Sequence, residues 1–262
     1  MVRLGTRGVG ATLFLAALVV VAPDASQRQQ APTQTVPPAD PPFVLRQPRP
    51  YPVGPPPSTP SPVERLGKDR LRIGAVFVDL GKKEVSVAAT VNDAPLAEFV
   101  ANTKGGFKSY ESVLEAETNA LNFDLGLTLI GLDRAHSVSP QFHFDPVPPQ
   151  GDPVDVWVSW GEGSRRRRVR ADELIYDEGT KKTLPVGKWV YIGSRIVEGG
   201  LVADLDGVLI GFVHTPAPLI ERVDPVPGPY GAIKMNPNLG LKPGDVVTLT
   251  VRALPSAVQR GN

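Results

Sequence analysis

Alternating apolar and polar positions predict β-strands along most of the chain after residue 70. Residues 72–80 and 85–91 alternate on either side of a Gly-Lys-Lys turn, which predicts a hairpin with one buried face. Similar runs, mostly joined by short turns, predict further strands at residues 96–101, 110–114, 154–160, 165–170, 188–197, 201–204, 208–214 and 245–252.

One substantial helix is predicted over residues 117–132. Its leucines recur at steps of four and three, as one helical face requires, at Leu121, Leu125, Leu129 and Leu132. A short helix is expected at residues 171–176. Many strands with one main α-helix predict an α+β domain built on an antiparallel or mixed β-sheet.

The N-terminus has the pattern of an export signal. Two arginines precede an apolar run over residues 8–22. A signal peptide has an apolar region of about 7 to 15 residues, whereas a spanning helix needs about 20. Residues 1–25 are therefore predicted to be a signal peptide. An uncleaved N-terminal anchor is the alternative, because Pro23 lies where a small residue usually precedes the cleavage site.

A proline-rich segment follows the predicted signal. Residues 23–62 contain 14 prolines and few large apolar groups, so they cannot bury enough surface to offset the entropy lost on ordering. We expect a disordered linker over residues 26–65, a folded domain over residues 66–256 and a flexible tail over residues 257–262. The predicted location is the periplasm, the cell envelope or the medium.

Composition excludes several classes of function. Of the 262 residues, 41% are hydrophobic and 21% are charged, which is typical of a globular protein. The net charge of +1 argues against a nucleic-acid partner. The absence of cysteine excludes disulfides, thiolate zinc sites and iron–sulfur clusters. No cofactor is expected.

The glycine-rich stretch "TKGGFKSYES" at residues 103–112 lacks the spacing of a phosphate-binding loop. Its paired glycines predict instead a tight hairpin connection between two strands. The alternative is a binding edge that faces a ligand, made of Lys104, Gly105, Gly106, Lys108 and Glu111.

Four consecutive arginines form the densest charged run of the chain: Arg165, Arg166, Arg167 and Arg168. Side chains of a strand alternate between its faces, so such a run requires solvent on both, as at the tip of a hairpin. A solvated tip is the main expectation and an anionic ligand the alternative. The nearby Trp157 and Trp160 should face opposite sides of their strand, with only one in the core.

Two histidines and one aspartate lie close together in the sequence: His136, His143 and Asp145. Imidazole and carboxylate can bind zinc, but the spacing matches no compact ligand pair of a helix or strand. A metal site at these residues is therefore only an alternative.

Ser194 and His214 invite comparison with a serine hydrolase. The esterase signature places a glycine two residues after the serine, whereas Ile196 occupies that position here. We expect no nucleophile at Ser194.

Six blocks occur in an order that resembles the YdjY-domain family of bacterial exported proteins: FVANTKGGFKSYESVL, LGLTLIGL, VDVWVSW, RADELIYD, KWVYIGSRI and LVADLDGVLIGFVHTPAPLIE. The resemblance runs roughly over residues 71–252 and implies an exported domain with no established activity. Some relatives carry clustered cysteines, which this chain lacks.

Taken together, these patterns predict an exported module that binds an envelope protein, a peptide or an anionic wall component. Contact with a membrane is expected only through an uncleaved N-terminal segment. A metal-dependent hydrolase that uses His136, His143 and Asp145 is the alternative.

Overall fold

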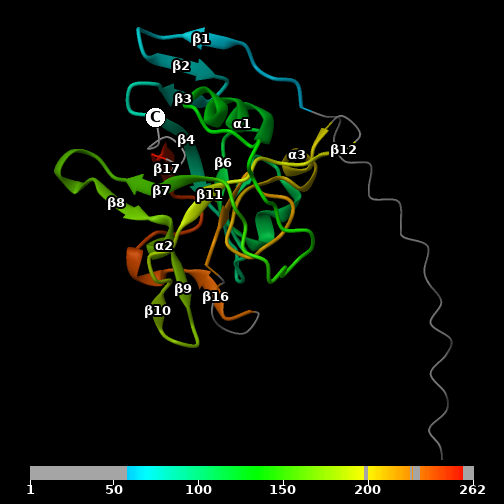
Figure 1. Ribbon diagram of the computed structural model, residues 1–262. Helices are drawn as coiled ribbons and strands as arrows, with labels where there is room; N and C mark the ends of the chain where they lie inside the picture. Colours follow the sequence, from blue (N-terminus) through cyan, green and yellow to red (C-terminus); the bar gives the residue numbers. More distant parts are fainter. Residues whose placement is uncertain (1–57, 198–199, 225, 227–230, 256–262) are drawn as a thin grey trace, which may run out of the picture. The chain divides into compact units, whose positions relative to one another are not determined.

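The computed structural model describes residues 58–197, 200–224, 226 and 231–255 (Figure 1). The predicted signal peptide, the predicted linker up to residue 57 and the predicted tail lie outside these residues. Within the described part, no helix has the length and hydrophobicity that crossing a membrane requires.

The described chain is mostly β-structure. Its strands are β1 (Val63–Arg65), β2 (Arg70–Ile73), β3 (Val76–Asp79), β4 (Glu84–Val91), β5 (Phe99–Thr103), β6 (Ser112–Ala116), β7 (Asp152–Trp160), β8 (Arg167–Arg170), β9 (Ile175–Asp177), β10 (Lys182–Thr183), β11 (Trp189–Tyr191), β12 (Ile196–Val197), β13 (Gly200–Leu201), β14 (Val208–Gly211), β15 (Ile220–Arg222), β16 (Ile233–Met235) and β17 (Val246–Ala253). The α-helices are α1 (Ala120–Leu129), α2 (Ala171–Leu174) and α3 (Val202–Asp206), and the 3₁₀ helices are η1 (Phe107–Glu111), η2 (Gly163–Arg165) and η3 (Pro237–Leu239).

Eight strands close into a β-barrel. Their order is β4, β17, β7, β11, β15, β14, β5 and β6, and β6 pairs again with β4. The neighbours β14–β15 and β5–β6 are parallel. The strands β3, β2 and β1 continue the sheet outward from β4, and β8 pairs with β7.

The predicted α+β sheet domain with one main helix is therefore wrong. The described residues form a mostly β domain around a closed barrel, with only three short α-helices. Closure depends on β6 returning to β4 and on β17 inserting between β4 and β7. Alternation along one strand carries no information about such distant partners, because it reports only which face is buried.

The barrel core follows from that alternation. Across β4, β17 and β7, aligned positions such as Val87, Leu249 and Val158 are all at most 1% exposed. The residues between them on each strand lie on the other face. A barrel of eight strands is just narrow enough for side chains to fill.

Helix α1 lies within the predicted residues 117–132, but its predicted buried face is only partly correct: Leu132 is buried and Leu125 packs against the core. Phe123 and Leu127 are fully buried, whereas Leu129 is 38% exposed. Gly126 allows close packing on β3 and β4, since a Cβ there would lie 3.2 Å from Val76 Cγ1 and 3.3 Å from Val85 Cγ1. The spacing of the leucines did not determine which face of α1 is buried. The face that contains Gly126 is buried because it fits closely against the sheet.

Other predicted strands also differ from the structure. Residues 72–80 are divided between β2 and β3 by a turn at Gly74, whose φ is +58°. Residues 188–197 form only β11 and β12, separated by four residues outside any strand. Most of residues 201–204 belong to helix α3, which ends at Gly207 with φ +68°. The left-handed glycine after the helix is a common helix end, and here it outweighs the short apolar pattern.

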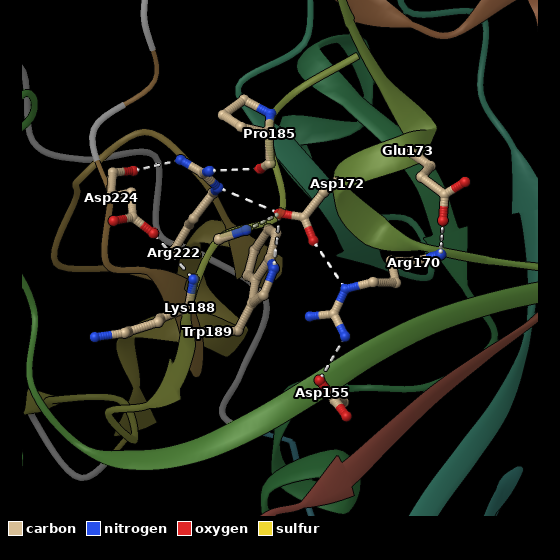
Figure 2. A network of polar contacts seen from close by, with 10 residues as sticks. Asp155, Arg170, Asp172, Glu173, Pro185, Lys188, Trp189, Arg222 and Asp224 are labelled. Carbon is tan, nitrogen blue, oxygen red and sulfur yellow. Dashed lines mark hydrogen bonds and ion pairs between the residues drawn. The ribbon is translucent and has the colours of Figure 1, made fainter.

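A buried ion-pair network ties β15 and β11 to α2 and β7 (Figure 2). We call it the Asp172 network; it consists of Asp155, Arg170, Asp172, Trp189 and Arg222. Asp172 Oδ1 accepts hydrogen bonds from Gly187 N at 3.2 Å, Trp189 Nε1 at 3.2 Å and Arg222 Nε at 3.4 Å. Its Oδ2 accepts from Arg170 Nε at 3.3 Å.

The two arginines of this network also have hydrogen-bond partners. Arg222 is 1% exposed and donates to the carbonyl oxygens of Pro185 at 2.9 Å and Asp224 at 2.7 Å. Arg170 also donates to Asp155 Oδ1 at 2.7 Å. Because every buried charge has partners, the network has the features of a structural element.

Candidate functional site

Two buried carboxylates meet where η1 approaches the start of β5. Glu98 is 3% exposed and Glu111 is 4% exposed. The Glu98 backbone N–H donates to the Glu111 carbonyl oxygen at 2.8 Å, which holds the two segments together. The charge of Glu111 also acts on the Glu98 carboxyl, so the two side chains form one electrostatic cluster.

Each carboxylate is in direct contact with one basic side chain. Lys108 Nζ lies 2.6 Å from Glu111 Oε1, and His143 Nε2 lies 3.1 Å from Glu98 Oε2. The other oxygen of Glu98, Oε1, is buried and has no hydrogen-bond partner among the described residues. Leaving a buried carboxylate oxygen unpaired is unfavourable, so this atom is available to a hydrogen-bond donor.

The pKa of Glu98 is raised above its ordinary value. Burial is the main cause and the negative charge of Glu111 adds to it, while His143 and Lys108 oppose the shift. Burial also raises the pKa of Asp206 on α3, where Lys108 and Arg195 act in the opposite direction. Titratable groups shifted by burial and by specific neighbours are typical of functional sites.

Exposed aromatic rings lie next to the basic partners of both carboxylates. Phe107 is 70% exposed and forms an edge-to-face pair with Tyr110 at 6.0 Å. Lys108 Nζ lies 5.9 Å and 5.7 Å from the centres of these two rings. The ring of His143, the partner of Glu98, stacks on Phe144 at 4.1 Å. We call the whole group the acid–aromatic site; its members are Glu98, Phe107, Lys108, Tyr110, Glu111, His143 and Phe144.

The glycine loop is not the hairpin that the sequence predicts. Strands β5 and β6 are parallel, and η1 connects them. Gly105 does have a positive φ of +65°. Gly106 is needed for close approach, since a Cβ there would lie 2.6 Å from the Gly207 carbonyl oxygen. Lys104 pairs with Glu117, so Lys108 and Glu111 are the members of this predicted edge that belong to the acid–aromatic site.

The three residues of the predicted metal alternative do not converge. The carboxylate of Asp145 accepts from the backbone N–H groups of Gln141 at 2.7 Å and Val147 at 2.9 Å, and these bonds lower its pKa. His143 pairs with Glu98, and His136 is exposed. In the described part of the chain, no group of three potential ligands has a geometry that could hold a metal ion.

Ser194 and His214 have separate partners. Ser194 Oγ accepts from Ala203 N at 2.8 Å, and the His214 ring nitrogens lie 2.8 Å and 3.1 Å from the carbonyl oxygens of Asp145 and Arg222. These contacts give both side chains a local structural role.

Glu98 is the member of the site that the sequence analysis missed. It lies in the predicted strand 96–101, between Ala97 and Phe99. All five residues of the following strand, β5, are buried. A charged residue inside an otherwise apolar buried run was the available signal, because acids are rarely buried without a specific role.

The arginine run lies at the predicted hairpin tip. Strands β7 and β8 pair from Trp157–Arg170 to Trp160–Arg167 and extend as a hairpin in Figure 1. All four arginines of the run are exposed. Arg168 lies 4.6 Å from the Trp157 ring centre and Arg167 lies 5.0 Å from that of Trp160. Both tryptophans are half-buried, and of the two only Trp160 packs against the hydrophobic core, which agrees with the expectation that one of them would.

A groove of about 620 Å³ lies beside this hairpin. Its lining includes Trp160, Arg166 and Val246. Arg165, Arg166 and Arg168 have no acidic partner in the residues that the structure describes. The arginine hairpin, which we define as residues 160–168, is therefore a positively charged surface next to a groove.

Fold and site together define a β-barrel domain with a buried acid pair whose basic partners contact exposed aromatic rings. Residues 76–223, more than half of the chain, match the YdjY domain. The chain therefore belongs to the YdjY-domain family, as its sequence blocks suggest. The matched residues include the whole acid–aromatic site but not β17, which completes the barrel. No curated protein and no solved structure matches the chain.

Proposed function

We propose that this protein is an exported envelope module that binds its ligand at the acid–aromatic site. The observation that carries the proposal is the buried and unpaired Glu98 Oε1 beside exposed aromatic rings. A ligand that donates a hydrogen bond to this oxygen would remove an unfavourable feature of the free protein. The rings would supply contact area, since exposed aromatic clusters often mark binding surfaces.

Export rests on the sequence pattern of residues 1–25. Its test is fractionation of cells that produce the full-length chain. We expect the protein outside the cytoplasm, and full-length protein dissolved in the cytoplasm would contradict the proposal. The ligand would then be a protein, a peptide or a wall component of the envelope.

Binding at the site can be tested without knowing the ligand. A photoreactive phenylalanine analogue replaces Phe107 in cells, and the same analogue replaces Phe77, which is 48% exposed on β3, as the matched control. We expect a specific adduct from position 107 alone, and its loss when Glu98→Gln is added. Equal labelling from both positions, or none, would count against a ligand at this site.

The arginine hairpin supports a second candidate, the binding of an anionic wall component. Three guanidinium groups without acidic partners in the described chain provide charge that such a polymer could neutralise. The test is retention of the full chain on a phosphate-bearing matrix. Retention should decrease with salt and with the double variant Arg165→Gln, Arg166→Gln. Retention that changes neither with salt nor in the double variant would exclude this candidate.

The metal-dependent hydrolase is not carried forward. Its predicted ligands His136, His143 and Asp145 have separate surroundings, as described above. Nothing in their arrangement favours metal chemistry over a loop held by hydrogen bonds.

A further inference from the structure

We propose that the ligand of the acid–aromatic site is a neutral, hydroxyl-rich saccharide of the cell envelope. This inference rests on the proposed function and narrows it from any envelope ligand to one chemical class. It depends on three features of the site: its internal charge pairing, the position of its aromatic rings and the absence of a usual peptide-binding feature.

The charge pairing disfavours ionic ligands. Lys108 pairs with Glu111 at 2.6 Å, and His143 contacts Glu98 at 3.1 Å. A cationic ligand would approach Lys108, and an anionic ligand would approach the two carboxylates. In a partly buried site, like charges at such short range are strongly unfavourable. A neutral ligand avoids both penalties.

The unpaired oxygen requires a donor. Glu98 is 3% exposed, and its Oε1 has no partner in the described part of the chain. A hydroxyl group can donate to this oxygen and accept from a cation at the same time. Lys108, whose side chain is 28% exposed, donates to Glu111 and Tyr110, which leaves one of its three N–H groups for that second bond. A ligand with several neighbouring hydroxyls therefore suits this pair of groups.

The aromatic rings suit the ring of a sugar. Phe107 lies beside Lys108 and Phe144 stacks on His143, and the two phenylalanines are 70% and 56% exposed. A pyranose presents C–H groups on its faces and hydroxyls around its edge, so it can cover an aromatic ring while its hydroxyls reach polar atoms. Exposed rings next to charged and hydrogen-bonding side chains provide both kinds of contact.

The usual features that bind peptides are not part of this site. Peptides are bound by addition to a free strand edge, in an apolar groove or by clusters of charge. Here β5 is paired on both sides, with β14 and with β6. Two cavities of about 620 Å³ and 450 Å³ lie elsewhere, one beside Trp160 and the other beside Asp69. A site that has exposed rings and lacks these peptide-binding features favours a saccharide over an extended peptide.

The experiment titrates the full-length chain by calorimetry with a neutral tetrasaccharide of N-acetylglucosamine and with a neutral tetrapeptide. We expect heat of binding from the saccharide alone. Phe107→Ala and Glu98→Gln should each weaken binding about tenfold, the loss expected when an aromatic or hydrogen-bond anchor is removed. Phe77→Ala, the exposed control on β3, should leave the affinity unchanged. Because Phe107 is 70% exposed, its replacement should not impair folding.

A second measurement tests the proposal even if the natural saccharide differs from the tetrasaccharide used in calorimetry. The adduct from position 107 in cells is digested with glycan-cleaving enzymes or with a protease. Digestion by the glycan-cleaving enzymes supports the saccharide, whatever the probe does. An adduct removed only by protease, or peptide binding that Phe107→Ala abolishes, overturns the saccharide but leaves the proposed function intact. No adduct and no binding overturns both, and saccharide binding that both variants leave unchanged overturns the assignment to this site.

Discussion

Asp172 and Glu98 are both buried carboxylates with basic neighbours, but they differ in whether both carboxylate oxygens have hydrogen-bond partners. Asp172 accepts from three donors at Oδ1 and from one at Oδ2. Glu98 contacts His143 through Oε2, while Oε1 has no partner among the described residues. No exposed aromatic ring belongs to the Asp172 network (Figure 2), whereas Glu98 contacts His143, whose ring stacks on the exposed Phe144.

This difference separates two uses of buried charge. A complete set of partners makes a carboxylate part of the scaffold, and removing one partner destabilises the fold. An incomplete set leaves an unfavourable group that folding does not require, and a ligand can relieve it. The comparison predicts that changes in the Asp172 network alter stability, whereas changes in the acid–aromatic site alter binding and titration.

The largest effect is expected from Arg222→Met. Arg222 is 1% exposed, and its loss removes one of the cations that balance Asp172. Breaking a buried pair from one side costs about 3–5 kcal/mol of unfolding free energy. Urea unfolding of the full chain measures it, with the exposed Arg166→Met as the control. A loss below about 1 kcal/mol would mean that the network is not structural.

Glu221 extends the comparison to an acid without any partner. It is fully buried, neither carboxylate oxygen has a partner in the described chain, and burial raises its pKa well above the usual value. The folded protein therefore keeps a proton that the unfolded chain releases. This stabilisation is complete below the unfolded pKa and is lost as pH rises through the folded pKa.

We expect stability to fall by up to about 1.4 kcal/mol per pH unit within that window because of Glu221. Glu221→Gln should flatten the dependence, since the amide does not ionise. Urea unfolding between about pH 5 and pH 8 makes the comparison. If both proteins show the same slope, Glu221 is not the group that titrates.

Titration of Glu98 should respond in opposite directions to its two neighbours. Glu111 raises the pKa of Glu98 and His143 lowers it. Glu111→Gln should therefore lower this pKa, and His143→Ala should raise it. Carbon NMR of the glutamate carboxyl groups measures the shift. Glu64→Gln, an exposed acid on β1, is the control, and shifts of equal sign in the two variants would show that the cluster is not coupled as described.

The smallest effect on stability is expected at the arginine hairpin. Arg165→Gln together with Arg166→Gln should change the unfolding free energy by less than about 0.5 kcal/mol, because exposed unpaired charges contribute little. Urea unfolding of the double variant measures this. A larger loss would show that these arginines support the fold. Reduced retention on a phosphate matrix could then result from unfolded protein rather than from lost binding.

The candidate site was partly predictable from the chain. Lys108 and Glu111 were recognised as a polar pair at a glycine loop, and His143 as a possible functional residue. Their meeting with Glu98 was not predictable, because His143 lies 45 positions after Glu98 and reaches it through a loop without a periodic pattern. Periodicity identifies which residues are buried, but it does not say which of them meet.

Local pattern alone established several features of this protein: alternating strands such as β4, β7 and β17, the existence of α1, and the order of blocks that marks the YdjY-domain family. These features follow from contacts between near neighbours in the chain. Closure of the barrel, the parallel pairing of β5 with β6, the buried face of α1 and the partners of Glu98 were decided by the tertiary structure. Each depends on segments far apart in the chain, whose fit is settled by packing and by the burial of charge rather than by local preference.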